Sequence, residues 1–196
     1  MATPERHALI LASTSRYRRE LLERLRLPFE CVAPGVDETP LSGEPPAAQA
    51  VRLARLKAEA VARRYPDAIV IGSDQVAELA GRTLGKPGER AAAHAQLRAC
   101  SGQEVLFHTA VQVLGGPPRS QSLLDRTTVR FRALRDDEIA RYLEAEQPYD
   151  CAGSFKVEGL GACLFDAVRN DDPTALIGLP LVQLSASLRA CGYALP

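Results

Sequence analysis

Residues 68–76 read AIVIGSDQV, an apolar run that passes directly into a polar triplet. The run predicts a strand of an α/β sheet that ends at Gly72, Ser73 and Asp74. Ligands of such sheets bind beyond the carboxyl ends of the strands, so a carboxylate at position 74 is well located for chemistry. The alternative is that Asp74 only begins a turn. Working outward from this stretch, we ask which other residues meet it.

The segment ASTSRYRRELLERL, residues 12–25, predicts a helix that follows a second apolar strand at 9–12. A helix N-terminus carries partial positive charge, which disfavours cations in the first turn. Three arginines nevertheless crowd this turn: Arg16, Arg18 and Arg19. They favour a bound anion, and the hydroxyl and N–H groups of residues 13–15 are typical of a phosphate site. The alternative is a solvated basic face with Ser15 as the N-cap.

The remaining pattern predicts a mixed α/β protein that forms one domain over residues 1–196, with two lobes and a cleft between them. Strands are expected at 29–33, 104–114 and 120–132, a hairpin at 79–84, and helices at 47–65, 89–100, 135–145 and 179–190. The segment GGPP, residues 115–118, is a hairpin signal between the two long strands. A glycine-rich loop is expected at 151–162, and a loop leads into the last helix from Pro173.

Charge and cysteine content narrow the class of protein. The 24 basic and 24 acidic residues balance, so no global field recruits nucleic acid or an anionic membrane, and any anion site is local. The five cysteines are odd in number and lack CxxC spacing, which favours free thiols in a reducing cytoplasm. The start MATPERHALI lacks the apolar core of a signal peptide, and no run of 18 apolar residues is present. We therefore expect a cytoplasmic protein without membrane or nucleic-acid partners.

Lysine is rare in this chain, and its positions are informative. Only Lys57, Lys86 and Lys156 occur among 24 basic residues. A sequence so rich in arginine is expected to use lysine where a compact point charge is needed. The segment GRTLGK, residues 81–86, is one residue short of a P-loop and is followed by Pro87, so that motif is excluded. GxGxxG and GxSxG motifs are absent as well.

The remaining candidates are two carboxylates, Glu38 and Asp74, with two lysines and the Ser/Arg turn. Two carboxylates can hold a hard divalent cation against substrate phosphates, and basic side chains neutralise the remaining charge. Each residue alone is equally compatible with an ordinary surface charge.

Six segments in order resemble the Maf family of nucleotide pyrophosphatases: LILASTSRYRRELL from Leu9, VDET at 36–39, LKAEAVA at 56–62, VIGSDQV at 70–76, LGKP at 84–87 and AGSFKVEG at 152–159. The resemblance covers nearly the whole chain. It implies a two-lobed Maf/ITPase-like fold around a central active-site cleft, in a possible homodimer. It also implies hydrolysis of a nucleoside triphosphate between the α- and β-phosphates with a divalent metal, Mg²⁺ or else Mn²⁺ or Co²⁺.

The same resemblance implies roles for individual residues. The triphosphate would be bound by five residues: Ser13, Arg18, Arg19, Lys57 and Lys86. Asp74 is implied to be the general base that activates water, and Glu38 would share the metal with it.

Base recognition is implied by a further set: Tyr17, Gln75 and Glu158. This set resembles the branch of the family that acts on 7-methyl-GTP, a modified nucleotide that such enzymes would remove from the pool. The physics agrees, because N7-methylated guanine is a cation that an aromatic face and a carboxylate both favour. Lys156 would help to bind the base or a phosphate, or would merely lie on the loop.

Two alternative functions stay open at this stage, and a third is disfavoured. The chain could act on other nucleotides, pyrimidine or modified, or it could be a non-hydrolytic regulator of cell division. A binder of this kind would tolerate Asp74→Asn, whereas an enzyme would not. An RNA-binding module is disfavoured by the balanced charge and by the 5% aromatic content, because single-strand binders need basic grooves with stacking platforms.

Overall fold

The computed structural model describes residues 7–116 and 119–196 and confirms the mixed α/β fold class. The strands are β1 (Leu9–Ala12), β2 (Glu30–Cys31), β3 (Ile69–Leu79), β4 (Arg82–Leu84), β5 (Glu104–Leu114), β6 (Ser120–Phe131) and β7 (Phe165–Arg169). The α-helices are α1 (Arg16–Glu23), α2 (Pro46–Ala62), α3 (Arg90–Cys100), α4 (Asp136–Glu146) and α5 (Leu181–Ala190). Three short 3₁₀ helices lie at Ala152–Ser154, Leu160–Leu164 and Ala175–Ile177.

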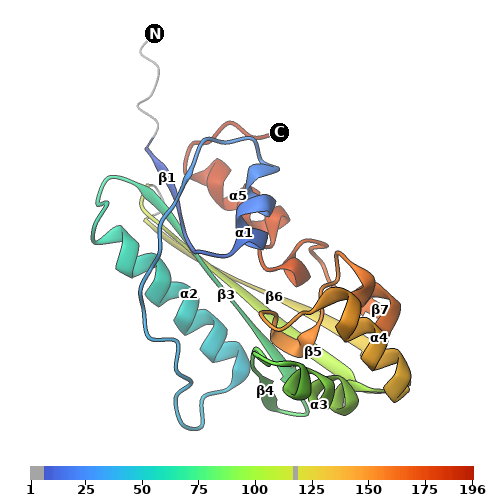
Figure 1. Cartoon of the computed structure of the whole chain (residues 1–196). Coiled ribbons are helices and arrows are strands. Elements are labelled where there is room, and N and C mark those ends of the chain that lie inside the picture. The colour runs from blue at the N-terminus through green and yellow to red at the C-terminus, as the bar shows by residue number, and fades with distance from the viewer. Residues whose placement is uncertain (1–6, 117–118) are drawn as a thin grey trace.

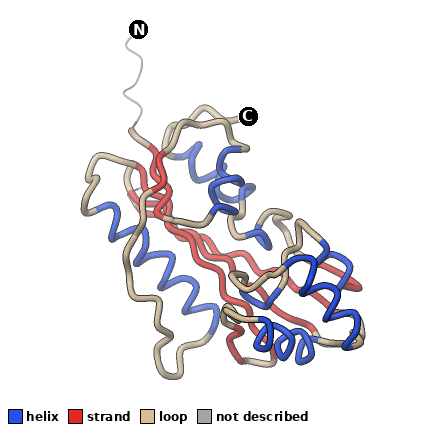
Figure 2. The backbone as a smooth tube through the Cα atoms, viewed as in Figure 1, coloured by secondary structure: helices blue, strands red, loops and turns tan. Residues whose placement is uncertain are grey.

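The strands form one sheet in the order β2-β1-β3-β5-β6-β7, with β4 paired to β3. β1 is parallel to β2 and β3, and all other pairs are antiparallel. The long strands β3, β5 and β6 extend from one end of the molecule to the other, as Figure 2 shows in red. They are therefore the common frame on which both lobes are built.

Helices cover the sheet unequally (Figure 1). Side chains alternate between the faces of a strand, so even-numbered residues of β3 face α2 while odd-numbered residues face the other helices. On that second face, α1 and α5 cover the end of β3 that carries Ile69 and Ile71. The helices α3 and α4 cover the other end, which carries Ala77 and Leu79. The helices α1 and α5 define a first lobe, and α3 and α4 define a second lobe.

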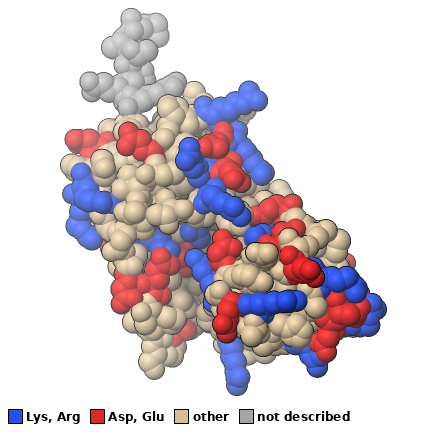
Figure 3. All heavy atoms as spheres, viewed as in Figure 1, with Lys and Arg blue, Asp and Glu red and all other residues tan. Residues whose placement is uncertain are grey.

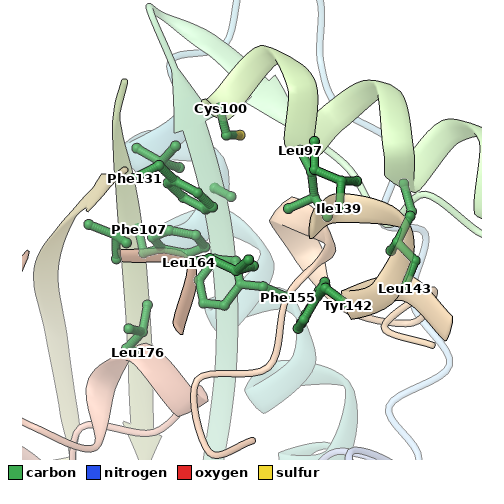
Figure 4. Packing of buried hydrophobic residues seen from close by; sticks show 14 residues of the cluster. Leu97, Cys100, Phe107, Phe131, Ile139, Tyr142, Leu143, Phe155, Leu164 and Leu176 are labelled. Carbon is green, nitrogen blue, oxygen red and sulfur yellow. The ribbon is translucent and has the colours of Figure 1, made fainter. Parts of the chain in front are cut away.

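The second lobe has an aromatic core (Figure 4). The ring of Phe155 makes edge contacts with the rings of Phe107, Phe131 and Phe165, at centroid distances of 4.8 to 5.7 Å. Burying rings of this size contributes roughly 2 kcal/mol each from the hydrophobic effect. The loop that contains Phe155 is thus tied firmly to the sheet.

The prediction that the strand of AIVIGSDQV ends at Gly72, Ser73 and Asp74 is wrong, because β3 continues to Leu79 and pairs with β5 from Val70 to Leu79. Asp74 therefore lies inside a strand, and the alternative of a turn at this residue is also wrong. The parallel pairing with β1 does stop at Gly72, opposite Ala12. Asp74 thus lies just beyond the carboxyl end of β1 rather than of its own strand.

Most other predicted elements are confirmed within a few residues. The hairpin at 79–84 is present, with Ala80 and Gly81 at positive φ as a tight turn between β3 and β4 requires. β5 and β6 pair from Leu114 and Ser120 onward, while Pro117 and Pro118 of the predicted turn lie outside the described residues. The strand expected at 29–33 is reduced to Glu30–Cys31, and β7 was not predicted because the strand that it pairs with, β6, is remote in sequence.

Candidate active site

A cavity of about 930 Å³ opens between the two lobes, where the edge of β3 is uncovered. β1 pairs with this edge up to Gly72, and β4 pairs with it from Ala77. In the described chain no strand covers the four residues between them, and three of these line the cavity: Asp74, Gln75 and Val76. Because the edge is open, side chains from both faces of the sheet reach the same cavity. Figure 3 shows acidic and basic atoms around the hollow between the lobes.

A lysine and two carboxylates meet at this edge. Lys57 Nζ donates to Asp74 Oδ1 at 2.7 Å and to Glu38 Oε2 at 2.8 Å. Lys57 and Asp74 are buried, whereas the side chain of Glu38 is 54% exposed. Charged groups of this kind are buried only when they are paired, so the contact secures both buried side chains. The structure thus joins three residues that are up to 36 positions apart in sequence.

Gly72 explains why α2 comes so close to β3. A Cβ atom at this position would overlap the carbonyl oxygen of Ala54 and the backbone nitrogen of Ala58, both in α2. Without a side chain at residue 72, the helix lies directly on the strand. Lys57, which precedes Ala58, then reaches Asp74, two residues further along the same face of β3.

The loop that carries Glu38 is stabilised by its neighbours. Asp37 Oδ1 accepts hydrogen bonds from the backbone nitrogen of Thr39 at 2.9 Å and from its hydroxyl at 2.6 Å. These bonds hold the pKa of Asp37 below its ordinary value and form an Asx turn. Arg52 of α2 donates to the carbonyl of Thr39 at 3.3 Å and pairs with Glu44. Within VDET, Asp37 therefore shapes the loop and Glu38 faces the cavity.

The turn between β1 and α1 forms the neighbouring wall of the cavity. Ser15 is the N-cap, since its hydroxyl accepts from the Arg18 nitrogen at 3.4 Å, and the Ser13 hydroxyl accepts from the Ser15 nitrogen at 3.1 Å. Arg18 Nε donates to the carbonyl of Gly178 at 3.0 Å. Burial lowers the pKa of Arg18 from its ordinary value, while Asp74 and Glu38 oppose this change. Arg18 and the helix N-terminus thus direct positive charge into the cavity.

The structure separates the remaining predicted phosphate ligands. Lys86 follows β4, is exposed and lines the cavity from the second lobe. Arg19 instead lies outside the cavity, where its Nε is 3.0 Å from Glu23 Oε1 on the exposed face of α1. The prediction that Arg19 joins the other phosphate ligands is therefore not supported by its position. The helical rotation of 100° per residue directs Arg18 and Arg19 to different faces.

The three residues expected to recognise the base all line the cavity: Tyr17, Gln75 and Glu158. Burial raises the pKa of Tyr17 to about 12, so its phenol stays neutral, and the Arg16 guanidinium lies 4.7 Å from the ring centroid. The amide nitrogen of Gln75 donates to Thr109 and to two backbone carbonyls, which leaves its carbonyl oxygen for other contacts. Glu158 is exposed at the cavity rim.

Some cavity residues were not predicted. The carbonyl of Gly178 accepts hydrogen bonds from Arg18 and from the Ser73 hydroxyl, both at 3.0 Å, so the segment before α5 forms part of the site. Gly178 has φ 127°, a conformation that disfavours side chains. Asp150 and Cys151 also line the cavity, next to Tyr17. The GLP sequence at 178–180 was a signal for a turn, but nothing local linked it to residue 18.

Among residues 7–116 and 119–196, no group of three or more histidine, cysteine or acidic side chains is arranged to hold a metal. Asp74 and Glu38 nevertheless fit a divalent ion that is shared with a substrate, because both carboxylates converge on one cation, Lys57 Nζ. Mg²⁺ commonly binds through one or two carboxylates and completes its shell with water and phosphate oxygens. The donor set is therefore suitable for such an ion.

None of the described helices combines the length and the apolar character needed to cross a membrane.

Comparison with known proteins identifies relatives over nearly the full chain. A 7-methyl-GTP pyrophosphatase of Xanthomonas oryzae pv. oryzae is 62% identical over 188 residues, covering 96% of this chain and 98% of the relative. A protein of the same name from a Polaromonas species is 58% identical over 194 residues, covering 98% and 89% of the two chains.

Solved structures with the same fold are more distant in sequence. The Staphylococcus aureus Ham1 protein aligns with a TM-score of 0.51 at 14% identity, covering 93% of this chain and 99% of that one. At this identity the likeness concerns the fold alone. The model of the family described as Maf-like protein matches residues 8–191, and the chain therefore belongs to the Maf family.

Proposed function

We propose that this protein is a nucleotide pyrophosphatase that hydrolyses 7-methyl-GTP to 7-methyl-GMP and pyrophosphate. The observation that carries the proposal is the meeting of Asp74, Lys57 and Glu38 at the open edge of β3, inside a cavity with cationic walls. Supporting it, the relatives at 58% and 62% identity are named 7-methyl-GTP pyrophosphatases.

The triphosphate is expected to lie between the lobes. Arg18 and the N–H groups at the start of α1 contact it from one side, with Ser13 beside them, and Lys86 approaches from the other side. Guanidinium groups and helix N-termini suit phosphate oxygens because they offer several donors together with positive charge. Two of the three cations in the first turn of α1 are thereby accounted for. Arg18 faces the cavity and the triphosphate, and Arg16 lies over the ring of Tyr17.

Asp74 is the general base of the proposed reaction. Its carboxylate accepts the proton of the water molecule that attacks the α-phosphorus, and the α–β bond breaks with pyrophosphate as the leaving group. Lys57 holds Asp74 in place and contributes positive charge near the phosphates. A divalent ion bound by Asp74 and Glu38 would supply further neutralisation of the phosphate charge.

Selectivity for the methylated base is expected from charge. The 7-methylguanine ring is cationic, so it gains cation–π attraction from the neutral Tyr17 ring and Coulomb attraction from Glu158. Gln75 presents a carbonyl oxygen that can accept from the base. A neutral base lacks this charge, so it gains neither the cation–π attraction of Tyr17 nor the Coulomb attraction of Glu158.

Pyrophosphate release from 7-methyl-GTP, GTP, dTTP and UTP in the presence of Mg²⁺, Mn²⁺ or Co²⁺ tests the proposal. We expect the highest kcat/KM with 7-methyl-GTP and no release after chelation of the metal with EDTA. Asp74→Asn should lower kcat by about 10²- to 10⁴-fold, the usual range for loss of a general base. Equal rates on all four nucleotides would contradict the base assignment, and full turnover by Asp74→Asn would favour a non-hydrolytic binder.

The proposal also covers the cellular compartment and the oligomeric state. Substrate of this kind is a free nucleotide of the cytoplasm, and neither nucleic acid nor membrane is needed as a partner. We further propose a homodimer, which light scattering of the purified protein would test.

A further inference from the structure

The carboxyl-terminal half of α4 holds the loop that carries Glu158 on both sides of that residue. The backbone nitrogen of Leu160 donates to Glu146 Oε1 at 2.7 Å. Lys156 Nζ donates to the carbonyl of Glu146 at 2.8 Å, and the Lys156 backbone nitrogen donates to the Tyr142 hydroxyl at 3.0 Å. Glu158 lies midway between these attachments. Its backbone is therefore located by the attachments to α4, together with turn hydrogen bonds from the Gly159 and Gly161 nitrogens to the Lys156 carbonyl at 3.3 and 3.1 Å.

The position of Lys156 follows from the way α4 ends. The helix stops at Glu146, because Gln147 adopts the left-handed conformation with φ 45° and ψ 57°. The last carbonyl groups of a helix have no partner within the helix and carry partial negative charge. The ammonium of Lys156 binds one of these carbonyls, so this lysine, which also lines the cavity, caps α4.

Gly159 allows the loop to lie against Glu146, and Gly161 allows the loop to fold back on itself. A Cβ atom at Gly159 would overlap the Glu146 carboxylate, and one at Gly161 would overlap the carbonyl of Lys156. At Gly159 the loop backbone thus packs directly on Glu146, whereas at Gly161 the loop packs on its own backbone at Lys156. Any side chain at residue 159 would force the carboxylate away from the Leu160 nitrogen.

We propose that Glu146 is a positioning residue for base selection, which acts by holding residues 156–160 so that Glu158 faces the base. The inference rests on the proposed function of Glu158 and goes beyond it, since Glu146 itself does not line the cavity. A mobile loop would have to be ordered each time a nucleotide binds, and this entropy cost would reduce the discrimination that Glu158 provides.

The decisive measurement is the ratio of kcat/KM for 7-methyl-GTP to kcat/KM for GTP. In Glu146→Leu we expect this ratio to fall by about tenfold, a typical effect when a contacting group loses its positioning. Glu146→Gln should keep most of the ratio, because the amide oxygen still accepts from the Leu160 nitrogen. Gly159→Ala should lower the ratio in the same way as Glu146→Leu, because it disrupts the same contact from the side of the loop.

Matched controls separate positioning from damage to the fold. Glu144 is exposed on the same helix, and Glu144→Leu should leave the ratio unchanged. Phe155 in the aromatic core and the 2.6 Å bond between the Ser154 and Gln96 side chains anchor the loop upstream in every variant. All variants are therefore expected to fold, as circular dichroism would verify.

Hydrogen exchange of the peptide covering residues 156–161 tests the attachment without substrate. Exchange should be faster in Glu146→Leu and unchanged in Glu144→Leu. The inference is overturned if Glu158→Gln loses the ratio while Glu146→Leu retains it, or if exchange is the same in Glu146→Leu and the wild type. Lack of any preference in the wild type would instead overturn the proposed function, and exchange would still decide whether Glu146 holds the loop.

Discussion

Lys57 Nζ lies 2.7 Å from Asp74 Oδ1, and the two side chains that form this ion pair are both buried. The second partner of the lysine, Glu38, is 54% exposed and can exchange its contact with solvent. Asp74 therefore depends on Lys57 for its charge to be tolerated, while Glu38 does not. The ion pair stabilises the fold and also positions the proposed general base.

Lys57→Met should reduce both stability and activity. Removal of one partner leaves the Asp74 carboxylate buried without its cation, which costs about 3 kcal/mol in the free energy of unfolding. Urea denaturation measures this loss, and pyrophosphate release measures the accompanying loss of turnover. The double variant Lys57→Met/Asp74→Asn should recover more than half of the lost stability but no activity. Full stability of Lys57→Met would contradict the pairing.

Two adjacent arginines provide a matched comparison for phosphate binding. Arg18 faces the cavity and Arg19 pairs with Glu23 on the surface. Loss of a charged hydrogen bond to phosphate costs about 2 kcal/mol, so Arg18→Ala should raise KM by roughly 30-fold. Arg19→Ala should leave KM within about twofold, because exposed helix pairs contribute only a few tenths of a kcal/mol. Similar KM values for the two variants would contradict the different positions of these side chains.

Gly72 and Gly85 test the close packing of α2 on β3. A Cβ at Gly72 would overlap α2 backbone atoms, whereas a Cβ at Gly85 would meet no atom within 4 Å. Gly72→Ala should therefore lower the free energy of unfolding by about 2 kcal/mol or more, since overpacking forces the backbone to move. It should also displace Lys57 and reduce turnover. Gly85→Ala should leave stability nearly unchanged in the same thermal or urea experiment.

Asp125 predicts a pH dependence of stability. Its side chain is 3% exposed on β6, and burial raises its pKa above the ordinary 3.8, with added repulsion from Asp172. Between these two pKa values the folded state retains a proton that the unfolded state has released. The free energy of unfolding contributed by this group is thus fully present below pH 3.8 and falls as pH rises through the raised pKa.

Asp125→Asn should remove this loss, so that the variant is more stable than the wild type at pH 7 and loses the advantage toward pH 4. Thermal unfolding across this range measures the difference. Asp137→Asn is a control of opposite sign, because hydrogen bonds from Arg135 and Arg141 lower the pKa of Asp137 to about 2. A gain from Asp125→Asn that is independent of pH would show that ionisation is not its cause.

Local patterns predicted most of the secondary structure. Apolar periodicity and turn residues identified β5, β6 and the helices, and the Ala80–Gly81 turn was correctly recognised. The same rules ended this strand at Gly72, Ser73 and Asp74, because a glycine followed by two polar residues resembles the end of a strand. The long antiparallel pairing with β5 overrides that local preference, and such pairing depends on residues that lie 26 to 44 positions away in the sequence.

The sequence by itself determined the α/β class, the family, and the residue types that a phosphate site requires, since these depend on local order and on motifs. It also placed a carboxylate close behind the apolar run at residues 68–71. Only the tertiary structure decided that the pairing of β1 with β3 ends at Gly72, so that Asp74 lies on the open edge of β3 and lines the cavity. It also decided that Arg18 and not Arg19 faces the cavity, and that α4 holds the loop of Glu158. These relationships join distant segments through packing and helix rotation, and no local pattern in the chain records them.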